Sequence, residues 1–363
     1  MRSHRTIRQW VRTLLPTATP SAQQAAGSLL RAWCLGFTVE LGQLARQLDR
    51  AGGTKQARQY LSRWLQHPTW EPVPLYAGLS RLTRRYLRRQ RRVLLLIDTT
   101  CLAVGWVVLQ VSVPFQRRAL PLYRAVYPYA GPERDQVQAL QTALRWVAQH
   151  LPGPRSRYVL VLDRGFPSTT WVRQWQAQGW RFVARIKGNW RVEGAGFTGL
   201  IRDAPLPART APTAPEPVCY PDVLLGWRDP RERGPEWRGV AHVVCFHAPQ
   251  QQAPWYLVTN LQSAWEAIRV YGERMCIEQE FRDLKGPFGL DHLATWTDGP
   301  RVARLLAWLA VYEWRLAYLW LFERLHEWEP ELRVGGRLSW IRTVREWLAR
   351  QARLYGRLAI DPL

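Results

Sequence analysis

The chain has few lysines, few acidic residues and no long uninterrupted apolar run. Only three of its 51 basic residues are lysines (Lys55, Lys187 and Lys285), and its 28 acidic residues leave a formal net charge of +23. An arginine-rich coding bias would explain the preference for arginine over lysine, but it would not explain the excess over acids. Because so large a charge repels itself unless a polyanion offsets it, we expect nucleic acid to be the partner.

Cysteine is also scarce, and its distribution argues against two classes of protein. The five cysteines are dispersed without a C-x-x-C pair, which argues against a disulfide framework and a zinc site. This pattern predicts reduced, buried thiols in an intracellular protein. The N-terminus carries charges through its apolar part, so a signal peptide is not expected. The most apolar segment, 302–322, contains three charges and is predicted to be a buried amphipathic helix, not a membrane span.

A length of 363 residues with 47% hydrophobic residues and 21 tryptophans predicts a folded protein of two or three domains. Residues 1–92 are strongly basic, and two segments with helical apolar spacing, VELGQLARQL and TKQARQYLSRWL, are separated by AGG. This outline is typical of a helix-turn-helix-like DNA reader. The run RLTRRYLRRQRR (81–92) follows and predicts either a solvated helix face or contacts with DNA phosphates.

From residue 93 onward, short apolar segments typical of strands alternate with helical patterns. VLLLIDTT (93–100) and YVLVLDRGF (158–166) are the clearest strands, and WYLVTNL (255–261) resumes the pattern after a Pro/Ala-rich interruption. Such alternation predicts an α/β layer with at least partly parallel strands. Residues 191–255 are interpreted as an insertion, in which the Pro/Ala-rich stretch APLPARTAPTAPEPVCYPD (204–222) is predicted to be irregular. The chain from 302 onward is predicted to be helical.

Two of the apolar strands each lead into an aspartate, Asp98 and Asp163. Open α/β sheets bind their ligands at the carboxyl ends of strands, so these side chains are candidates for a metal site. A structural role as a helix N-cap or turn residue remains open for both. A third carboxylate would be expected in a site that acts on phosphates.

The third carboxylate is sought in YGERMCIEQEFRDLK, residues 271–285. If this segment is one helix, a single stripe roughly 60° wide holds four polar residues: Tyr271, Arg274, Glu278 and Lys285. The other acids, Glu273, Glu280 and Asp283, point elsewhere and are expected to be solvated or paired. The stripe predicts either a surface ladder of salt bridges or a metal ligand flanked by groups that hold phosphates.

The spacing Tyr-x2-Arg-x3-Glu-x6-Lys resembles the signature of the DDE transposases of insertion-sequence family four. LLLIDTT, DRGF after an apolar strand, WYLVTNL and RMCIEQEFRDLKGPFGL occur in the order of that family and are most similar to its Tn-ten branch, which is related to Tn-five. The resemblance covers roughly residues 30–325. It implies an α/β fold with a ribonuclease-H-like catalytic core, a β-rich insertion and helical flanking regions.

The resemblance also implies roles for individual residues. Asp98, Asp163 and Glu278 match the catalytic, metal-binding triad, which would hold two Mg²⁺ ions, for which Mn²⁺ can substitute. Tyr271, Arg274 and Lys285 match positions that hold DNA phosphates. Trp255 matches a tryptophan that stacks on a flipped base, although a role as a core aromatic remains open.

The expected function is a cut-and-paste DNA transposase that acts as a homodimer on terminal inverted repeats and joins them to target DNA, through a hairpin intermediate. It is expected to be cytoplasmic, associated with the nucleoid when bound to DNA, and independent of membranes. The alternatives are a ribonuclease-H-like nuclease without strand joining and a catalytically decayed DNA-binding protein. The expected domains are a helical DNA-binding domain (1–92), the catalytic core (93–190 and 256–300), the insertion (191–255) and a C-terminal helical region (301–363).

Overall fold

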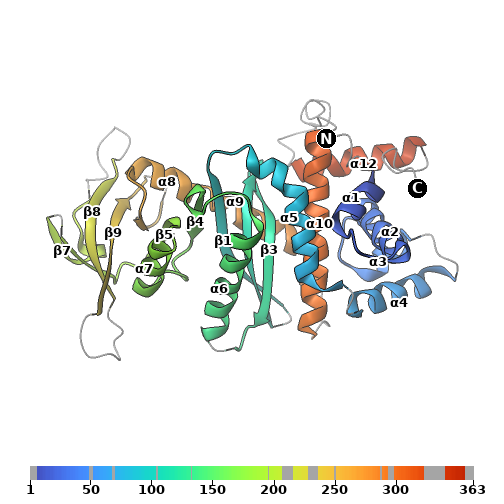
Figure 1. Cartoon of the computed structure of the whole chain (residues 1–363), viewed down its shortest axis with the longest axis horizontal. Helices are drawn as coiled ribbons and strands as arrows, with labels where there is room; N and C mark the ends of the chain where they lie inside the picture. Colours follow the sequence, from blue (N-terminus) through green and yellow to red (C-terminus); the bar gives the residue numbers. More distant parts are fainter. Residues whose placement is uncertain are drawn as a thin grey trace.

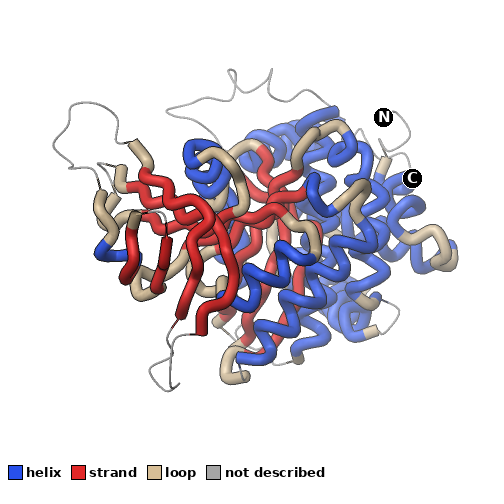
Figure 2. The backbone as a smooth tube through the Cα atoms, turned by 60° about the vertical axis from the view of Figure 1, so that its left-hand side comes forward, coloured by secondary structure: helices blue, strands red, loops and turns tan. Residues whose placement is uncertain are grey.

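The structure is a computed structural model of the chain. It describes residues 6–48, 52–67, 70–103, 105–131, 133–194, 196–206, 216–227, 236–248, 251–286, 288–292, 298–322 and 340–355. Figure 1 shows an elongated molecule with the strands toward one end and most helices toward the other, and Figure 2 shows the same separation after rotation.

A single ten-stranded sheet runs through the described part of the chain, in the order β3-β2-β1-β4-β5-β10-β9-β8-β6-β7. The strands are β1 (Val93–Leu102), β2 (Trp106–Phe115), β3 (Arg118–Pro128), β4 (Tyr158–Leu162), β5 (Arg181–Arg185), β6 (Arg191–Gly194), β7 (Phe197–Leu200), β8 (Val218–Trp227), β9 (Glu236–Phe246) and β10 (Trp255–Thr259). β1, β4 and β5 are parallel neighbours, and the other pairs are antiparallel. The predicted α/β class with partly parallel strands is therefore confirmed.

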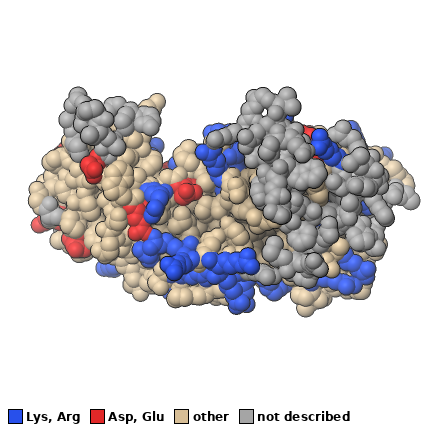
Figure 3. Space-filling view, turned by 90° about the horizontal axis from the view of Figure 1, so that it is seen from above, with Lys and Arg blue, Asp and Glu red and all other residues tan. Residues whose placement is uncertain are grey.

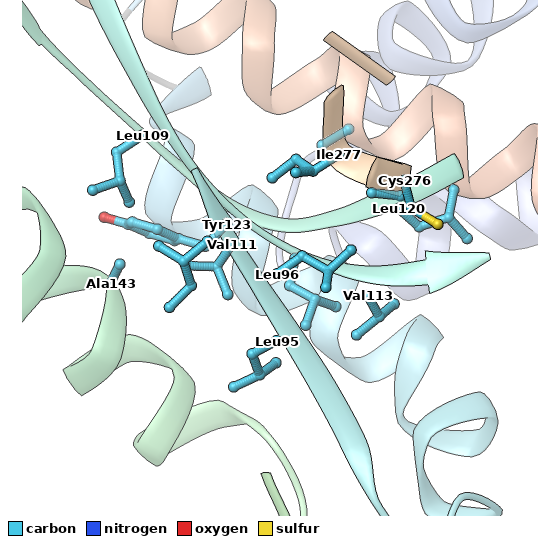
Figure 4. Packing of buried hydrophobic residues seen from close by; sticks show 14 of the residues in the cluster. Leu95, Leu96, Leu109, Val111, Val113, Leu120, Tyr123, Ala143, Cys276 and Ile277 are labelled. Atoms are coloured by element: carbon cyan, nitrogen blue, oxygen red, sulfur yellow. The ribbon is translucent and has the colours of Figure 1, made fainter. Parts of the chain in front are cut away.

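Helices cover both faces of the sheet because its central strands are apolar on both sides. Every residue of β4 is buried. On one face, α6 (Glu133–His150) packs on β2 and β3; on the other, α9 (Met275–Lys285) packs on β1, β2 and β3. Figure 4 shows Leu95 on the side of α6 and Leu96 on the side of α9, as the alternation of side chains along β1 requires.

The described part of the chain before β1 is helical. Its helices are α1 (Ile7–Leu14), α2 (Pro20–Gly36), α3 (Leu41–Ala45), α4 (Gly53–Gln66) and α5 (Pro72–Arg88). Gly52, just before α4, and Gly53, its first residue, have φ of 93° and 76°, values that favour glycine and so explain the GG of the predicted turn. Ala51 of that AGG turn lies outside the described residues. The helix-turn-helix-like DNA reader stays a prediction.

The C-terminal helices pack against this N-terminal region. α10 (Gly299–Phe322) contacts α2, α4 and α5, and α12 (Trp340–Tyr355) contacts α2 and α10. Trp64 and Trp70 stack with ring centroids 4.4 Å apart, and Trp308 of α10 lies 5.0 Å from Trp64. α10 contains the apolar segment 302–322 and is largely buried, as predicted. Among the described helices, none is long and apolar enough to cross a membrane.

The insertion does not form a separate sheet. β9 pairs with β10 along five residues, so β6–β9 extend the central sheet outward. Part of the Pro/Ala-rich stretch predicted to be irregular, 207–215, lies outside the described residues. Its end is a strand, in contrast to the prediction: VCYPD begins β8, which accommodates Pro221 and Asp222 through a bulge, with a φ of 49° at Asp222. The predicted domain boundaries stay a prediction.

Two further expectations need correction. The segment 271–285 is not one helix: α8 (Ala264–Gly272) ends before α9 begins, and tight backbone bonds from Arg274 N to Tyr271 O (3.0 Å) and from Cys276 N to Glu273 O (3.0 Å) form the junction. Gly272, a poor helix former, lies at the break. The cysteines are free, but Cys101 and Cys219 are exposed, not buried.

Candidate active site

Asp98 and Asp163 lie side by side because of the parallel pairing of β1 and β4. Ile97 is opposite Leu162, so the next residues, Asp98 and Asp163, lie at the same level along the two strands. β1 continues to Leu102 through its pairing with β2, so Asp98 lies within a strand and caps no helix. Asp163 begins a turn in which its carbonyl accepts from Phe166 N at 3.1 Å, which leaves its side chain free to face Asp98.

Arg274, at the start of α9, brings the predicted carboxylates together. Its Nη1 lies 2.8 Å from Asp98 Oδ2 and 4.0 Å from Asp163 Oδ2. Its Nη2 pairs with Glu278 Oε1, one helical turn further along α9. Three carboxylates from three distant segments therefore surround one guanidinium group. The side chains keep access to solvent, with exposed fractions of 14% for Asp98, 27% for Asp163 and 34% for Glu278.

Burial and charge act in opposite directions on the pKa of Asp98. Removal from water raises the pKa of Asp98 to about 6, although Arg274 and the Thr99 amide, which donates to Oδ1 at 2.8 Å, both lower it. The neighbouring Asp163 and Glu278 raise it further. Burial alone would lower the pKa of Arg274, but Tyr271 and the three carboxylates around it raise that pKa, so the guanidinium group remains charged.

An aromatic group lies beside the carboxylates. The Tyr271 hydroxyl donates to Asp163 Oδ1 at 3.0 Å, and the Tyr271 ring lies 5.7 Å from the Arg274 guanidinium carbon. Burial raises the pKa of Tyr271, so its hydroxyl keeps its proton and can donate. The half-buried Trp255, the first residue of β10, packs edge-on against Tyr271 with centroids 4.8 Å apart. Both a stacking role and a packing role for Trp255 remain compatible with this position.

The remaining polar residues of 271–285 behave differently from one another. Lys285, the last residue of α9, is half-buried, and its side chain makes no hydrogen bond or ion pair with the described residues. Of the acids predicted to be solvated or paired, Asp283 pairs with Arg118 at 2.5 Å, Glu280 is buried with Arg124, and Glu273 accepts from Cys276 Sγ at 3.6 Å.

Basic side chains are available to bind a polyanion. Arg81, Arg84, Arg88 and Arg89 of the run 81–92 are exposed on and just after α5. Figure 3 shows Lys and Arg gathered across the middle of one face of the molecule, between the β-rich end and the helical end. Arg81 also has a structural role, since its Nη2 donates to Leu14 O at 3.1 Å at the end of α1.

The donor chemistry of the site suits a divalent cation. Asp98, Asp163 and Glu278 offer only carboxylate oxygens, which hard cations prefer, and all three already face one positive group. Within the described residues, no three His, Cys, Asp or Glu side chains are arranged as a ready metal site. Arg274 lies between the carboxylates, so a metal ion would take the place of its guanidinium group.

The sequence prediction missed a polar cluster next to this site. Arg124 of β3 lies among Gln110, Glu280 and Glu313, and all four are buried. The available signal was a polar residue within each of two apolar strands, VVLQVSV and LPLYRAVYP. Such residues need a partner that only tertiary structure reveals.

Comparison with known proteins gives a family and a distant structural similarity. The sequence model of the transposase DDE domain matches residues 126–314, which include Asp163, Glu278 and the other predicted site residues except Asp98. Comparison with curated proteins finds no match. A solved structure titled as the piggyBac transposase synaptic complex with hairpin DNA is 11% identical, with a TM-score of 0.39, and the alignment covers 99% of this chain and 82% of that one.

Proposed function

This chain belongs to the transposase DDE domain family, and from that premise we propose that it is a DNA transposase of the insertion-sequence-four type. In this proposal it excises an element at terminal inverted repeats and joins the ends to target DNA. The observation that carries the proposal is the convergence of Asp98, Asp163 and Glu278 around Arg274. The partly parallel sheet supports a ribonuclease-H-like core for residues 93–190 and 256–300, with helical domains at 1–92 and 301–363 and the insertion at 191–255.

The carboxylates are proposed to hold two Mg²⁺ ions. Bound there, the metal would polarise the scissile phosphate and activate water or a 3′-hydroxyl for in-line attack. Strand cleavage, the hairpin steps and strand transfer would all be the same phosphoryl transfer and would differ only in the nucleophile. Asp98, Asp163 and Glu278 would provide the oxygen ligands, and the Tyr271 hydroxyl holds Asp163 in place through its 3.0 Å hydrogen bond.

The cations of the site are proposed to bind DNA. Arg274, once released from the carboxylates, presents a planar guanidinium group suited to a phosphate, and Lys285 adds a second positive charge on the same helix. Trp255, which packs against Tyr271, would stack on an unpaired base. The exposed arginines of α5 would bind the DNA backbone further away, and a homodimer would bridge the two ends.

The test is an incubation of the full chain with labelled DNA that carries the inverted repeats flanking its gene, in the presence of Mg²⁺ or Mn²⁺. End-specific cleavage followed by joining is expected, and Asp98→Ala should abolish both. Asp203→Asn is the matched control, because Asp203 is 63% exposed and interacts only weakly with Arg202 at 3.7 Å. Cleavage without joining would indicate a nuclease, and binding without cleavage would indicate a decayed enzyme; either result overturns the proposal.

A further inference from the structure

A row of polar side chains crosses three strands on the face of the sheet that α9 covers. Asp98 of β1 is opposite Gln110 of β2, and Gln110 is opposite Arg124 of β3. Because residues opposite each other in a sheet point to the same face, all three side chains lie under α9. The row therefore leads from a proposed metal ligand to the buried Arg124.

All three guanidinium nitrogens of Arg124 have hydrogen-bond or ion-pair partners on this face. Its Nη2 lies 2.6 Å from Glu280 Oε1 and 2.9 Å from Glu313 Oε2, and its Nε donates to Gln110 Oε1 at 2.6 Å. Its Nη1 donates to the carbonyl oxygen of Leu306 at 3.1 Å. Gln110 in turn donates from Nε2 to Glu280 Oε2. Arg124 thus links β2, β3, α9 and α10 through four directed hydrogen bonds and ion pairs, and the Gln110–Glu280 hydrogen bond adds a second link between β2 and α9.

Stability alone does not account for such a cluster. The side chains of Arg124, Glu280 and Glu313 are only 0%, 3% and 5% exposed, and buried ion pairs of this kind are often replaceable by apolar residues without loss of stability. Apolar packing, however, does not fix the relative orientation of the packed elements as directional hydrogen bonds do. A planar guanidinium group with fixed donors specifies the rotation and the position along its axis of the helix that bears Glu280.

The rotation of α9 matters because Glu278 is only two residues from Glu280. Two residues turn about 200° around the axis and rise about 3 Å, so Glu280 can point into the sheet while Glu278 points toward Arg274 and Asp98. A small rotation of α9 would move Glu278 out of line with Asp98 and Asp163. α9 also starts directly after the break that follows α8, so α8 does not continue into it as one helix to set its orientation.

We propose that Arg124, together with Gln110 and Glu280, is a positioning unit that holds α9 in the orientation in which Glu278 faces Asp98 and Asp163. The inference rests on the proposed function in that these three carboxylates are taken to bind the metal. None of the three positioning residues contacts DNA or metal in this assignment. They act through Glu278, whose alignment they set.

The test replaces the three residues of the unit, and Glu313, which would otherwise lose its cation, by apolar residues in the full chain: Gln110→Leu, Arg124→Met, Glu280→Met and Glu313→Leu. No charge is left buried and unpaired, so the melting temperature should remain within a few degrees of wild type. Mn²⁺ affinity, measured by electron paramagnetic resonance without DNA, should fall by about 10- to 100-fold, as for other residues that orient metal ligands. With DNA, kcat should fall while KM for DNA changes little, and the amides of α9 should exchange hydrogen faster in the metal-free protein.

Glu313→Gln is the matched control, because it removes a carboxylate from the same arginine but leaves the contact with α9. Its Mn²⁺ affinity should stay within about three-fold of wild type, well below the loss expected for misplaced metal ligands. If the apolar variant does not fold, Arg124→Lys is tested in the same way, because lysine keeps the charge but lacks the planar set of donors of the guanidinium group. A folded variant with wild-type Mn²⁺ affinity and unchanged exchange in α9 would overturn the inference.

The two proposals fail separately. If wild-type protein shows no Mn²⁺ site that Asp98→Ala removes, the proposed function fails. Hydrogen exchange in α9 still decides whether Arg124 holds this helix, because that readout needs neither metal nor DNA.

Discussion

Replacing Glu313 by glutamine should stabilise the protein at alkaline pH and leave it nearly unchanged in acid. Glu313 shares Arg124 with Glu280, so two buried carboxyls face one cation. Burial raises the pKa of Glu313 to about 7 from 4.5, in spite of Arg124. Burial also raises the pKa of Glu280, and the nearby Glu313 raises it further. Glu313 Oε1 has no hydrogen-bond partner among the described residues, which leaves that oxygen free to carry a proton.

Proton linkage gives the direction in which the free energy of unfolding changes with pH. Because the folded protein binds this proton more tightly than the unfolded chain, the free energy of unfolding falls as pH rises from 4.5 through about 7. Each pKa unit is worth about 1.4 kcal/mol, so about 2 kcal/mol is lost between pH 5.5 and pH 7 and little more above it. Glutamine has the shape of the protonated acid and cannot ionise, so the variant should escape this loss.

The assay is urea unfolding followed by tryptophan fluorescence at pH 5.5 and pH 8.5. The variant should gain about 2 kcal/mol relative to wild type between these two pH values. Glu71→Gln provides the control: Glu71 is 55% exposed in its pair with Arg304, so its removal should change stability by less than about 1 kcal/mol at either pH. An equal effect of Glu313→Gln at both pH values, or a loss at pH 8.5, would refute the reasoning.

Three further outcomes are expected. Ser168→Ala removes the N-cap of α7 (Thr169–Ala177) and should lower the free energy of unfolding by about 1 kcal/mol, measured by urea unfolding. Tyr271→Phe removes the hydrogen bond to Asp163 and should cost about 1 kcal/mol in the same assay; an unchanged stability would mean that this bond contributes nothing. Arg84→Ala and Arg88→Ala should each reduce the slope of log affinity for duplex DNA against log salt by about 0.9, measured by fluorescence anisotropy, if both arginines bind phosphates.

The sequence was sufficient to predict the strands that carry the candidate site. The apolar runs before Asp98 and Asp163 made both strands visible. Helical spacing singled out Glu278 from the other acids of 271–285, although the single helix that this spacing assumed is broken after Gly272. The structure brings these three carboxylates together around Arg274. Their catalytic and metal-binding roles stay a prediction, as do the DNA contacts of Lys285 and Trp255.

Other features depend on contacts that sequence periodicity does not contain. The break between α8 and α9 involves Gly272 and two tight turns, which a continuous helical pattern conceals. The strand that begins at VCYPD was missed because its proline and the prolines before it suggest a loop, whereas a bulge opposite β9 accommodates Pro221. The partners of Arg124 lie in other strands and helices. The sequence therefore indicated that a polar residue is buried in this strand, but it did not indicate which groups Arg124 binds or what it does.

The pairing of β10 between β5 and β9 has a consequence for the order of folding. β5 and β10 are far apart in the sequence, so joining them directly requires closing a long loop before any contact is gained. β9 and β10 are close neighbours along the chain and form an antiparallel pair first at low entropic cost. β9 would then deliver β10 to β5 already extended, so substitutions that weaken the β9–β10 pair should slow the refolding of the sheet.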